Sequence, residues 1–392
     1  MLSSGYDDAN FNLGSQFFLE IFTYRAQLRD TMRAEVSDDI TVVAGLDAEW
    51  EKTDLRIRLP NQGPPKEGEV NVGPPDFTDV VFIEENDLRE RSVALFANLE
   101  LQGFDDKLLV VPGVRMDYFE QVDAFTFEPR ITARYDLNQQ WVLKGGAGLF
   151  MQPPTDDETI PGFGNPNLGP EKAFQYSLGT EYRPLEHLSF DVTLFYKDLE
   201  DLVGQPEQTA DNTDVERYAN AAEGRVYGME LLVKHELANN FFGWITYTLS
   251  RAERLDPGET KYRLFDFDQT HILTLIGSYQ LPLNWEISAR WRYVTGNPDT
   301  PIVGGIFNAD TDRYEALVGA VNSSRLSSFH QLDIRVDKRW IYETWQLNLY
   351  LDIQNAYNRS NVEGQDFNFD FSQSQPQQGL PLLPVLGIKG SF

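Results

Sequence analysis

The chain has 392 residues, of which 41% are hydrophobic and 13% aromatic, and its 61 acidic and 33 basic residues give a formal net charge of −28. No stretch approaches the roughly 20 apolar residues that a spanning helix needs, which excludes a helical membrane protein, and so acidic a chain repels phosphate backbones, so no nucleic-acid partner is expected. Cysteine is absent, which excludes disulfides, thiolate metal sites and cysteine catalysis.

Alternation of apolar and polar residues predicts a series of long β-strands. It is clearest where Leu347, Leu349 and Leu351 share one face of the chain and Asn348 and Tyr350 the other. Helical periodicity is nowhere sustained, so the fold class is expected to be all-β. About fifteen strands are predicted, near residues 16–35, 40–58, 89–102, 107–119, 125–136, 141–151, 172–184, 187–199, 220–236, 241–252, 269–281, 285–297, 328–340, 344–357 and 383–392.

The connections alternate between short turns and long polar loops, the latter near residues 59–88, 152–171, 200–219, 253–268, 298–327 and 358–382. Short turns at one edge and long loops at the other are typical of a transmembrane, antiparallel, up-and-down β-barrel of the bacterial outer membrane. Trp141, Trp285, Trp340 and Trp345 all adjoin short turns, which predicts an aromatic belt at the periplasmic rim. The lipid of that membrane is therefore an expected partner.

The number of strands suggests that the barrel is incomplete. Single-chain bacterial barrels have an even number of strands, whereas an odd number is predicted here. Met1 to Asn10 contain neither a basic nor an apolar leader region. Residues 1–392 are therefore expected to be one partial barrel domain, with at least one strand lying before Met1.

Four segments, in order, resemble the TonB-dependent outer-membrane receptors. NPNLGPE at 165–171 is similar to a motif that precedes a mid-barrel strand in that family, and GMEL at 228–231 to another of its strands. FDFDQTH at 265–271 resembles the start of a further strand, and DIQNAYN at 352–358 the penultimate strand. The final Phe392 resembles the terminal aromatic residue that barrel-assembly machinery reads.

The resemblance implies the C-terminal part of a plugged barrel of 22 strands, with the plug and first strands absent from this chain. It further implies uptake of a scarce solute, such as a siderophore, cofactor or saccharide, driven by the TonB complex of the inner membrane. A passive porin without a plug is the first alternative, and upstream sequence would separate the two. A β-rich adhesion protein is the second, and dependence on detergent would separate that one.

Enzyme chemistry is not expected. Ser327, Ser328, His330 and Asp333 contain the residue types of a hydrolytic triad, but His330 and Asp333 fall on opposite faces of one strand. Asn308, Asp310 and Asp312 have the spacing of a calcium loop, but Arg313 replaces the turn glycine, which excludes an EF-hand and leaves a weak divalent site or a solvated loop. No cofactor is expected.

The loops are the expected ligand site. Residues 59–88 contain seven acidic residues and one Lys, and residues 152–171 contain four acidic residues and no basic one, so the mouth should repel anions. We therefore expect a small ligand that is neutral, cationic or bound with the help of a divalent ion. The candidate binding residues, chosen for loop position and aromatic, acidic or amide character, are Phe163, Asn165, Asn167, Phe265, Phe307, Asp310, Asp312, Tyr314 and Phe367.

Overall fold

The protein consists almost entirely of β-strands. The computed structural model describes residues 1–13, 17–60, 67–68, 80–160, 164–206, 217–310 and 312–392. The strands are β1 (Leu2–Leu13), β2 (Phe17–Ser37), β3 (Ile40–Pro60), β4 (Val80–Gly103), β5 (Leu108–Phe119), β6 (Ala124–Asp136), β7 (Trp141–Gln152), β8 (Glu171–Leu185), β9 (Leu188–Gly204), β10 (Ala219–Ala238), β11 (Phe241–Leu255), β12 (Arg263–Leu264), β13 (His271–Leu281), β14 (Trp285–Val294), β15 (Pro298–Asp299), β16 (Ile302–Asn308), β17 (Arg313–Val318), β18 (Ser324–Arg325), β19 (Phe329–Ile341), β20 (Gln346–Gln354), β21 (Val362–Phe367), β22 (Ser374–Gln378) and β23 (Leu383–Ser391). The helical segments of the described chain are α1 (Asp156–Thr159), η1 (Glu120–Val122) and η2 (Pro282–Asn284). None of these helices has the length and apolar composition needed to span a bilayer.

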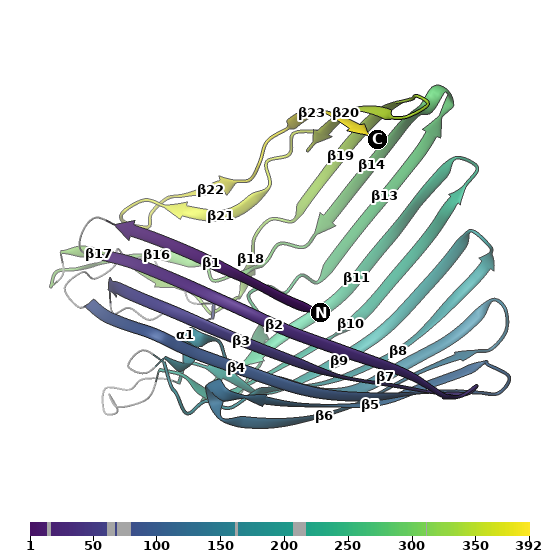
Figure 1. The fold of residues 1–392 in the computed structure, drawn as a ribbon. Coiled ribbons are helices and arrows are strands. Elements are labelled where there is room, and N and C mark those ends of the chain that lie inside the picture. Colours follow the sequence, from purple (N-terminus) through teal and green to yellow (C-terminus); the bar gives the residue numbers. More distant parts are fainter. Residues whose placement is uncertain (14–16, 61–66, 69–79, 161–163, 207–216, 311) are drawn as a thin grey trace.

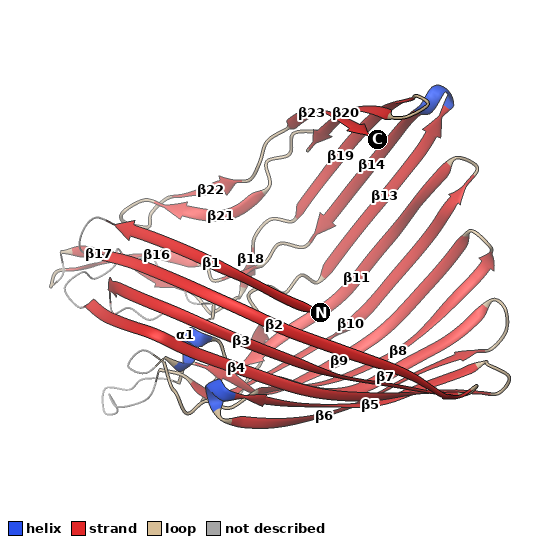
Figure 2. Cartoon of the chain, in the orientation of Figure 1, coloured by secondary structure: helices blue, strands red, loops and turns tan. Residues whose placement is uncertain are grey.

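Most strands belong to one antiparallel sheet that follows the chain order from β1 to β11 and continues through β13, β14, β19, β20 and β23 (Figure 1). Figure 2 shows this sheet curving into a wall around an interior, with β1 and β23 at its two edges. Within the described residues β1 pairs only with β2, and β23 only with β20. The outer edges of both strands therefore carry backbone groups without a sheet partner.

Two strands of the sheet, β1 and the short β12, were not predicted. The sheet has 17 strands among the described residues, including the two-residue β12, and without β12 the number is even. The additional strand is β1, whose polar sequence LSSGYDDANFNL shows no regular apolar alternation. It begins opposite Leu28 and rises toward the long loops, so the predicted odd number of strands was wrong and gives no argument for or against a strand before Met1.

Three expected loops also contain more strand than predicted. β4 begins at Val80 rather than near residue 89, so part of the segment 59–88 belongs to the wall. The loops at 298–327 and 358–382 contain the hairpins β16–β17 and β21–β22. These hairpins lie at the loop end of the wall (Figure 1). They are outside the apolar band, so their strands need no apolar face and show no alternation that would predict them.

The two faces of the sheet differ in polarity as the sequence predicted. On β2, Tyr24 and Leu28 point outward and are 41% and 43% exposed. On the inner face, Arg29 and Arg115 each donate to the carboxylate of Asp47 at 3.0 Å. A face of exposed apolar side chains is stable when it contacts acyl chains, and a paired polar face suits a water-filled or plugged interior.

Outward aromatic residues form two belts. The turn-side belt contains Trp141, Tyr182, Phe190, Phe241, Tyr279, Trp285, Trp340 and Trp345, and the loop-side belt contains Tyr24, Trp50, Tyr118, Phe125, Tyr176, Tyr196, Tyr227, Tyr247, Tyr293 and Tyr357. Residues of the two belts lie six apart on β9 and eight apart on β14, which is about 20 to 26 Å along a strand. Since the strands of outer-membrane barrels are tilted by about 35–45° and their apolar band is about 25 Å tall, that separation is of the same order as the band. Trp141, Trp285, Trp340 and Trp345 lie on the outer face at the turn end, as predicted.

Candidate functional site

The NPNLGPE segment is a structural anchor for the loop that precedes β8. Asn165 is 5% exposed, and its side-chain amide donates to the carbonyl of Tyr218 at 2.9 Å. Its Oδ1 accepts the backbone N–H of Asn167 at 2.8 Å. Asn220 of β10 then accepts the N–H of Gly169 at 2.7 Å and donates to its carbonyl at 3.0 Å. These hydrogen bonds therefore fix the position at which the loop ends and β8 begins.

The FDFDQTH segment forms a second anchor. Asp268 is 1% exposed, and its Oδ1 accepts the backbone N–H of Ala252 at 2.7 Å. Arg325 forms an ion pair with the same carboxylate and donates to the carbonyls of Asp268 at 2.9 Å and Gly296 at 3.0 Å. This group of contacts joins β11, the start of β13 and the loop at 298–327.

A polar junction connects three loops that are distant in sequence. The guanidinium of Arg263 donates to Glu67 at 3.0 Å, and the backbone N–H of Gly68 donates to Asp266 at 2.8 Å. Asn322 donates to the other oxygen of Asp266 at 2.6 Å, and Thr300 donates to the carbonyl of Gly68 at 2.6 Å.

Burial also changes the charge properties of this junction. Burial raises the pKa of the Glu67 carboxyl, against the effect of Arg263 beside it. Burial lowers the pKa of Arg254, whose guanidinium lies over the ring of Phe265 at 4.3 Å. Phe265 is therefore part of this loop assembly, and its ring is engaged by a neighbouring cation.

An acidic pocket lies below these loops, on the inner face of β2 to β4. A cavity of about 340 Å³ is lined by the carboxylates of Glu49, Glu51, Glu90, Glu120 and Asp156, together with Arg25, Arg91, Ser92, Phe119, Gln121, Pro153 and Pro154. Arg25 forms ion pairs with Glu51 at 2.6 Å and Glu49 at 3.0 Å. With Arg25 and Arg91 as the two cations of the lining, the pocket keeps an excess of negative charge.

One carboxyl of this acidic pocket is held in its protonated form. Asp156 belongs to α1, which begins with a capping box formed by Thr155 and Glu158, and Gln121 donates to Asp156 at 3.3 Å. Burial, followed by the charge of Asp156 and a hydrogen bond with it, raises the pKa of Glu90 to about 8. Burial likewise raises the pKa of Asp156. Near neutral pH the two carboxyls share a proton.

Three of the loop aromatics form one exposed cluster. Phe307 and Tyr314 face each other across the hairpin β16–β17, with ring centroids 5.2 Å apart. Phe369, from the hairpin β21–β22, packs edge-on against Tyr314 at 5.8 Å. Phe307, Tyr314 and Phe369 are 49%, 39% and 80% exposed, so this aromatic cluster presents its rings to the solvent outside the barrel.

The remaining candidate residues lie apart from one another at the loop end of the wall. Asp310 and Asp312 lie at the exposed tip of β16–β17, where the N–H of Asp310 donates to Asn308 at 2.9 Å. Phe367 packs on Phe371 at 6.3 Å within its own hairpin. Phe163 lies outside the described residues. The described candidates thus share the loop end without converging on one point.

Two features of the candidate site were not predicted from the sequence. Glu90 was predicted to lie near the start of the strand at 89–102, and nothing in the sequence placed it beside Asp156. The ring of Phe369 was recognisable as a loop aromatic but not as the neighbour of Tyr314, because the two residues come from different loops. The one sequence signal for the position of Glu90 was the alternation on β4, which places Glu90 on the same inward face as Ser92 and Ala94.

The triad-like residues are separated as predicted. His330 points outward, where its Nδ1 shares a hydrogen bond with the hydroxyl of Tyr357 at 2.7 Å. Asp333 points inward, where it accepts a hydrogen bond from Arg290 at 3.0 Å. A nucleophile, base and acid cannot act together across the two faces of a sheet.

Comparisons with known proteins agree with this architecture. The sequence profile of the family described as "TonB dependent receptor-like, beta-barrel" matches residues 2–356. No curated protein matches the chain. Among solved structures, the copper transporter OprC is 14% identical with a TM-score of 0.67, covering 99% of this chain and 61% of its own.

Two further structures are similar at the same level. The pyoverdine outer-membrane receptor FpvA of Pseudomonas aeruginosa is 14% identical, with a TM-score of 0.62 and coverage of 96% of this chain and 53% of its own. The FrpB iron transporter of Neisseria meningitidis is 13% identical, with a TM-score of 0.62 and coverage of 95% and 55%. The chain therefore spans little more than half the length of these proteins.

Proposed function

Since the chain belongs to the TonB-dependent receptor-like β-barrel family, we propose that it is part of an outer-membrane receptor that imports a scarce solute by TonB-coupled transport. The observation that carries the proposal is the two-faced sheet, with its apolar band between two aromatic belts and its paired polar interior. The similar solved structures, which are an iron transporter, a copper transporter and a pyoverdine receptor, support it.

The direct test is energy dependence. Uptake of the ligand by cells that carry the complete protein should stop when the TonB complex is deleted or the proton gradient is collapsed, while binding at the cell surface should persist. Uptake that continues unchanged in such cells would leave a passive barrel as the better description. A catalytic turnover of the ligand at the loop end would contradict a transport role altogether.

We propose that the plug and the TonB-contact segment lie outside residues 1–392, together with strands that complete the wall. Unpaired backbone groups cost several kcal/mol each in hydrocarbon, so the free edges of β1 and β23 require partners in a membrane. In a receptor those partners are additional strands. In a plugless porin, the alternative, β1 and β23 would pair directly with each other.

Cysteine cross-linking distinguishes these two closures. The sequence has no native cysteine, so one cysteine at Ser4 and another at successive positions of β23 form a disulfide only if their Cα atoms come within about 7 Å. We expect no disulfide at any position of β23 in the complete protein. Efficient bonding at one register would favour the porin.

We propose that the ligand is neutral, cationic or accompanied by a divalent ion. The acidic pocket supports this, because its excess carboxylates repel an anion and attract a cation. Binding of a cationic ligand should tighten as ionic strength falls, and Glu51→Gln should weaken it. Glu236→Gln, at the turn end of β10, is the matched control and should have no effect. Tighter binding of a strongly anionic siderophore at low ionic strength would refute this proposal.

An adhesion protein remains the third candidate and differs in one measurable property. A soluble β-protein needs no amphiphile, whereas the outward band of this chain would be a very large exposed apolar surface in water. The complete protein should therefore remain monodisperse only in detergent or lipid. Monomeric behaviour in plain buffer would argue for adhesion and against transport.

A further inference from the structure

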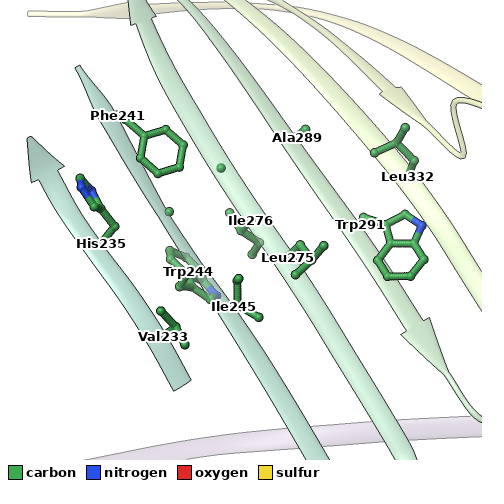
Figure 3. Close-up of a pocket in the computed structure, with 12 residues that line it drawn as sticks. Val233, His235, Phe241, Trp244, Ile245, Leu275, Ile276, Ala289, Trp291 and Leu332 are labelled. Carbon is green, nitrogen blue, oxygen red and sulfur yellow. The ribbon is translucent and has the colours of Figure 1, made fainter. Parts of the chain in front are cut away.

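The outer face of the wall contains an apolar groove near the turn-side belt. It has a volume of about 440 Å³ and is lined by residues of β10, β11, β13, β14 and β19, most of which face outward (Figure 3). Gly243, Gly277 and Ala289 are the small residues that line it, and Figure 3 shows the larger side chains of Trp291, Leu332 and Phe241 around it.

The strand register produces this groove. Gly243 pairs with Gly277, and Gly277 pairs with Ala289, so three small residues lie side by side across three adjacent strands. The row two residues toward the loops consists of Ile245, Leu275, Trp291 and Leu332, and the row two residues toward the turns consists of Phe241, Tyr279, Ile287 and Val336. Two rows of large side chains thus enclose one row of small ones.

Gly243 is required by close approach. A Cβ atom at Gly243 would lie 2.5 Å from the carbonyl oxygen of Ile276 and 3.0 Å from the ring of Phe241. A Cβ atom at Gly277 would contact the same ring at 3.4 Å. The ring of Phe241 therefore lies over the glycines and closes the turn-side end of the groove.

The shape and the surroundings of the groove select its occupant. The row of small residues in the groove is three strands wide, about 10 Å between the outer strand axes, and lies inside the apolar band. The volume of about 440 Å³ suits a flexible hydrocarbon chain, whereas a helix with its side chains is about 10–12 Å across and is too wide for that row. The positively charged side chain of Lys338 lies beside the groove, at its turn-side rim. Lys338 points outward next to Trp285, with its amine 5.4 Å from the ring of Trp285 and 5.5 Å from that of Trp340.

We propose that this groove binds one acyl chain of a glycerophospholipid of the periplasmic leaflet, with the lipid phosphate close to Lys338. The inference rests on the proposed membrane location of the barrel. The acyl chain fills the part of the groove that the ring of Phe241 leaves open, above Ala289 and beside Trp291 and Leu332, where loosely packed lipid would otherwise leave unfilled space. The phosphate gains an attraction at the rim, where the aromatic belt meets the headgroups.

The test is native mass spectrometry of the complete protein, purified in mild detergent, with phosphatidylglycerol and diacylglycerol of the same acyl chains as added probes. Ala289→Leu fills the groove and should reduce bound phosphatidylglycerol about tenfold, the effect of losing the burial of about two methylene groups. Ala133→Leu, the same change at an exposed outward position of β6, is the matched control and should leave the bound lipid unchanged.

The headgroup is tested separately. Wild-type protein should retain phosphatidylglycerol better than diacylglycerol, and Lys338→Gln should remove that preference. Equal loss of lipid in the Ala289 and Ala133 variants, or full retention in both, would overturn the proposal. A change from dimer to monomer on Ala289→Leu would show that a second copy occupies the groove instead. Failure of the proposed membrane location would look different, because the complete protein would then remain soluble without any amphiphile.

Discussion

Arg325 on β18 and Asp268, three residues before β13, form an ion pair across 57 residues of sequence, and the carboxylate is 1% exposed. The pair closes the loop at 298–327 onto the wall. Because the guanidinium also donates to two backbone carbonyls, this one side chain makes three of the contacts that hold the loop bearing part of the aromatic cluster.

Removing that side chain should release the loop. Arg325→Ala leaves the Asp268 carboxylate buried without its cation, and such a change costs about 3–5 kcal/mol. The loss should be seen as a lower midpoint of urea unfolding in micelles and as rapid proteolysis within 298–327. Arg56→Ala, which breaks the exposed pair with Glu20, is the control and should cost at most about 1 kcal/mol. Equal effects from both variants would mean that the buried pair does not hold the loop.

The lipid-facing assignment of the outer surface is testable at Leu349. This residue points outward on β20 and is 38% exposed. Leu349→Arg should destabilise the folded barrel in bilayers by about 2–4 kcal/mol if the residue contacts mid-bilayer lipid. Leu380→Arg, in the loop between β22 and β23, should have little effect. A neutral result at Leu349 would require a different orientation of the sheet.

The contact between α1 and the wall should depend on pH. The pKa of Glu90 is raised from 4.5 to about 8, so the folded state holds a proton that the unfolded chain releases. The stability contributed by this contact is therefore fully present below about pH 4.5 and is lost as the pH rises through about 8. Spin labels at Asp157 and Ala48 should move apart over that range.

Glu90→Gln supplies the control for this pH effect. A neutral amide keeps the hydrogen bond to Asp156 without a titrating proton, so the distance between the labels should become independent of pH. Glu236→Gln, at the opposite end of the wall, should leave the pH dependence intact. A wild-type distance that is constant from pH 4 to 9 would contradict the shared proton.

The aromatic cluster is expected to act in ligand capture rather than in stability. Phe369 is 80% exposed, so Phe369→Ala should change the free energy of unfolding by at most about 0.5 kcal/mol. Loss of an exposed aromatic anchor should weaken ligand binding by about tenfold, measured on whole cells. Phe104→Ala is the control, because Phe104 is 73% exposed in a short turn at the other end. Unchanged binding would remove the cluster from the ligand site.

The terminal Phe392 is expected to serve assembly. It is fully exposed and stacks loosely on Trp345, with ring centroids 6.3 Å apart. Phe392→Ala should lower the amount of folded barrel in the outer membrane, and Phe392→Tyr should restore it, because an aromatic ring is retained. Comparable thermal stability of the purified variants would assign the defect to assembly. Normal amounts of the alanine variant would exclude a role as an assembly signal.

Much of the fold could be predicted from residues whose alternation reports burial. Leu347, Leu349 and Leu351 identify β20 because each strand must place an apolar face toward lipid. β1 was missed for the same reason, since its polar sequence gives no such alternation and only its pairing with β2 makes it a strand. The hairpin β16–β17 stands outside the apolar band, where no alternation is required.

The sequence by itself determined the all-β class, the division into short turns and long loops, and the family motifs, because these depend on local period and turn chemistry. Only the tertiary structure decided that Glu90 meets Asp156, that Tyr314 meets Phe369, and that Gly243, Gly277 and Ala289 form one row. Each of these contacts depends on strand register and loop packing. Register is set by the sum of many weak pairings across neighbouring strands, and no single stretch of sequence contains that sum.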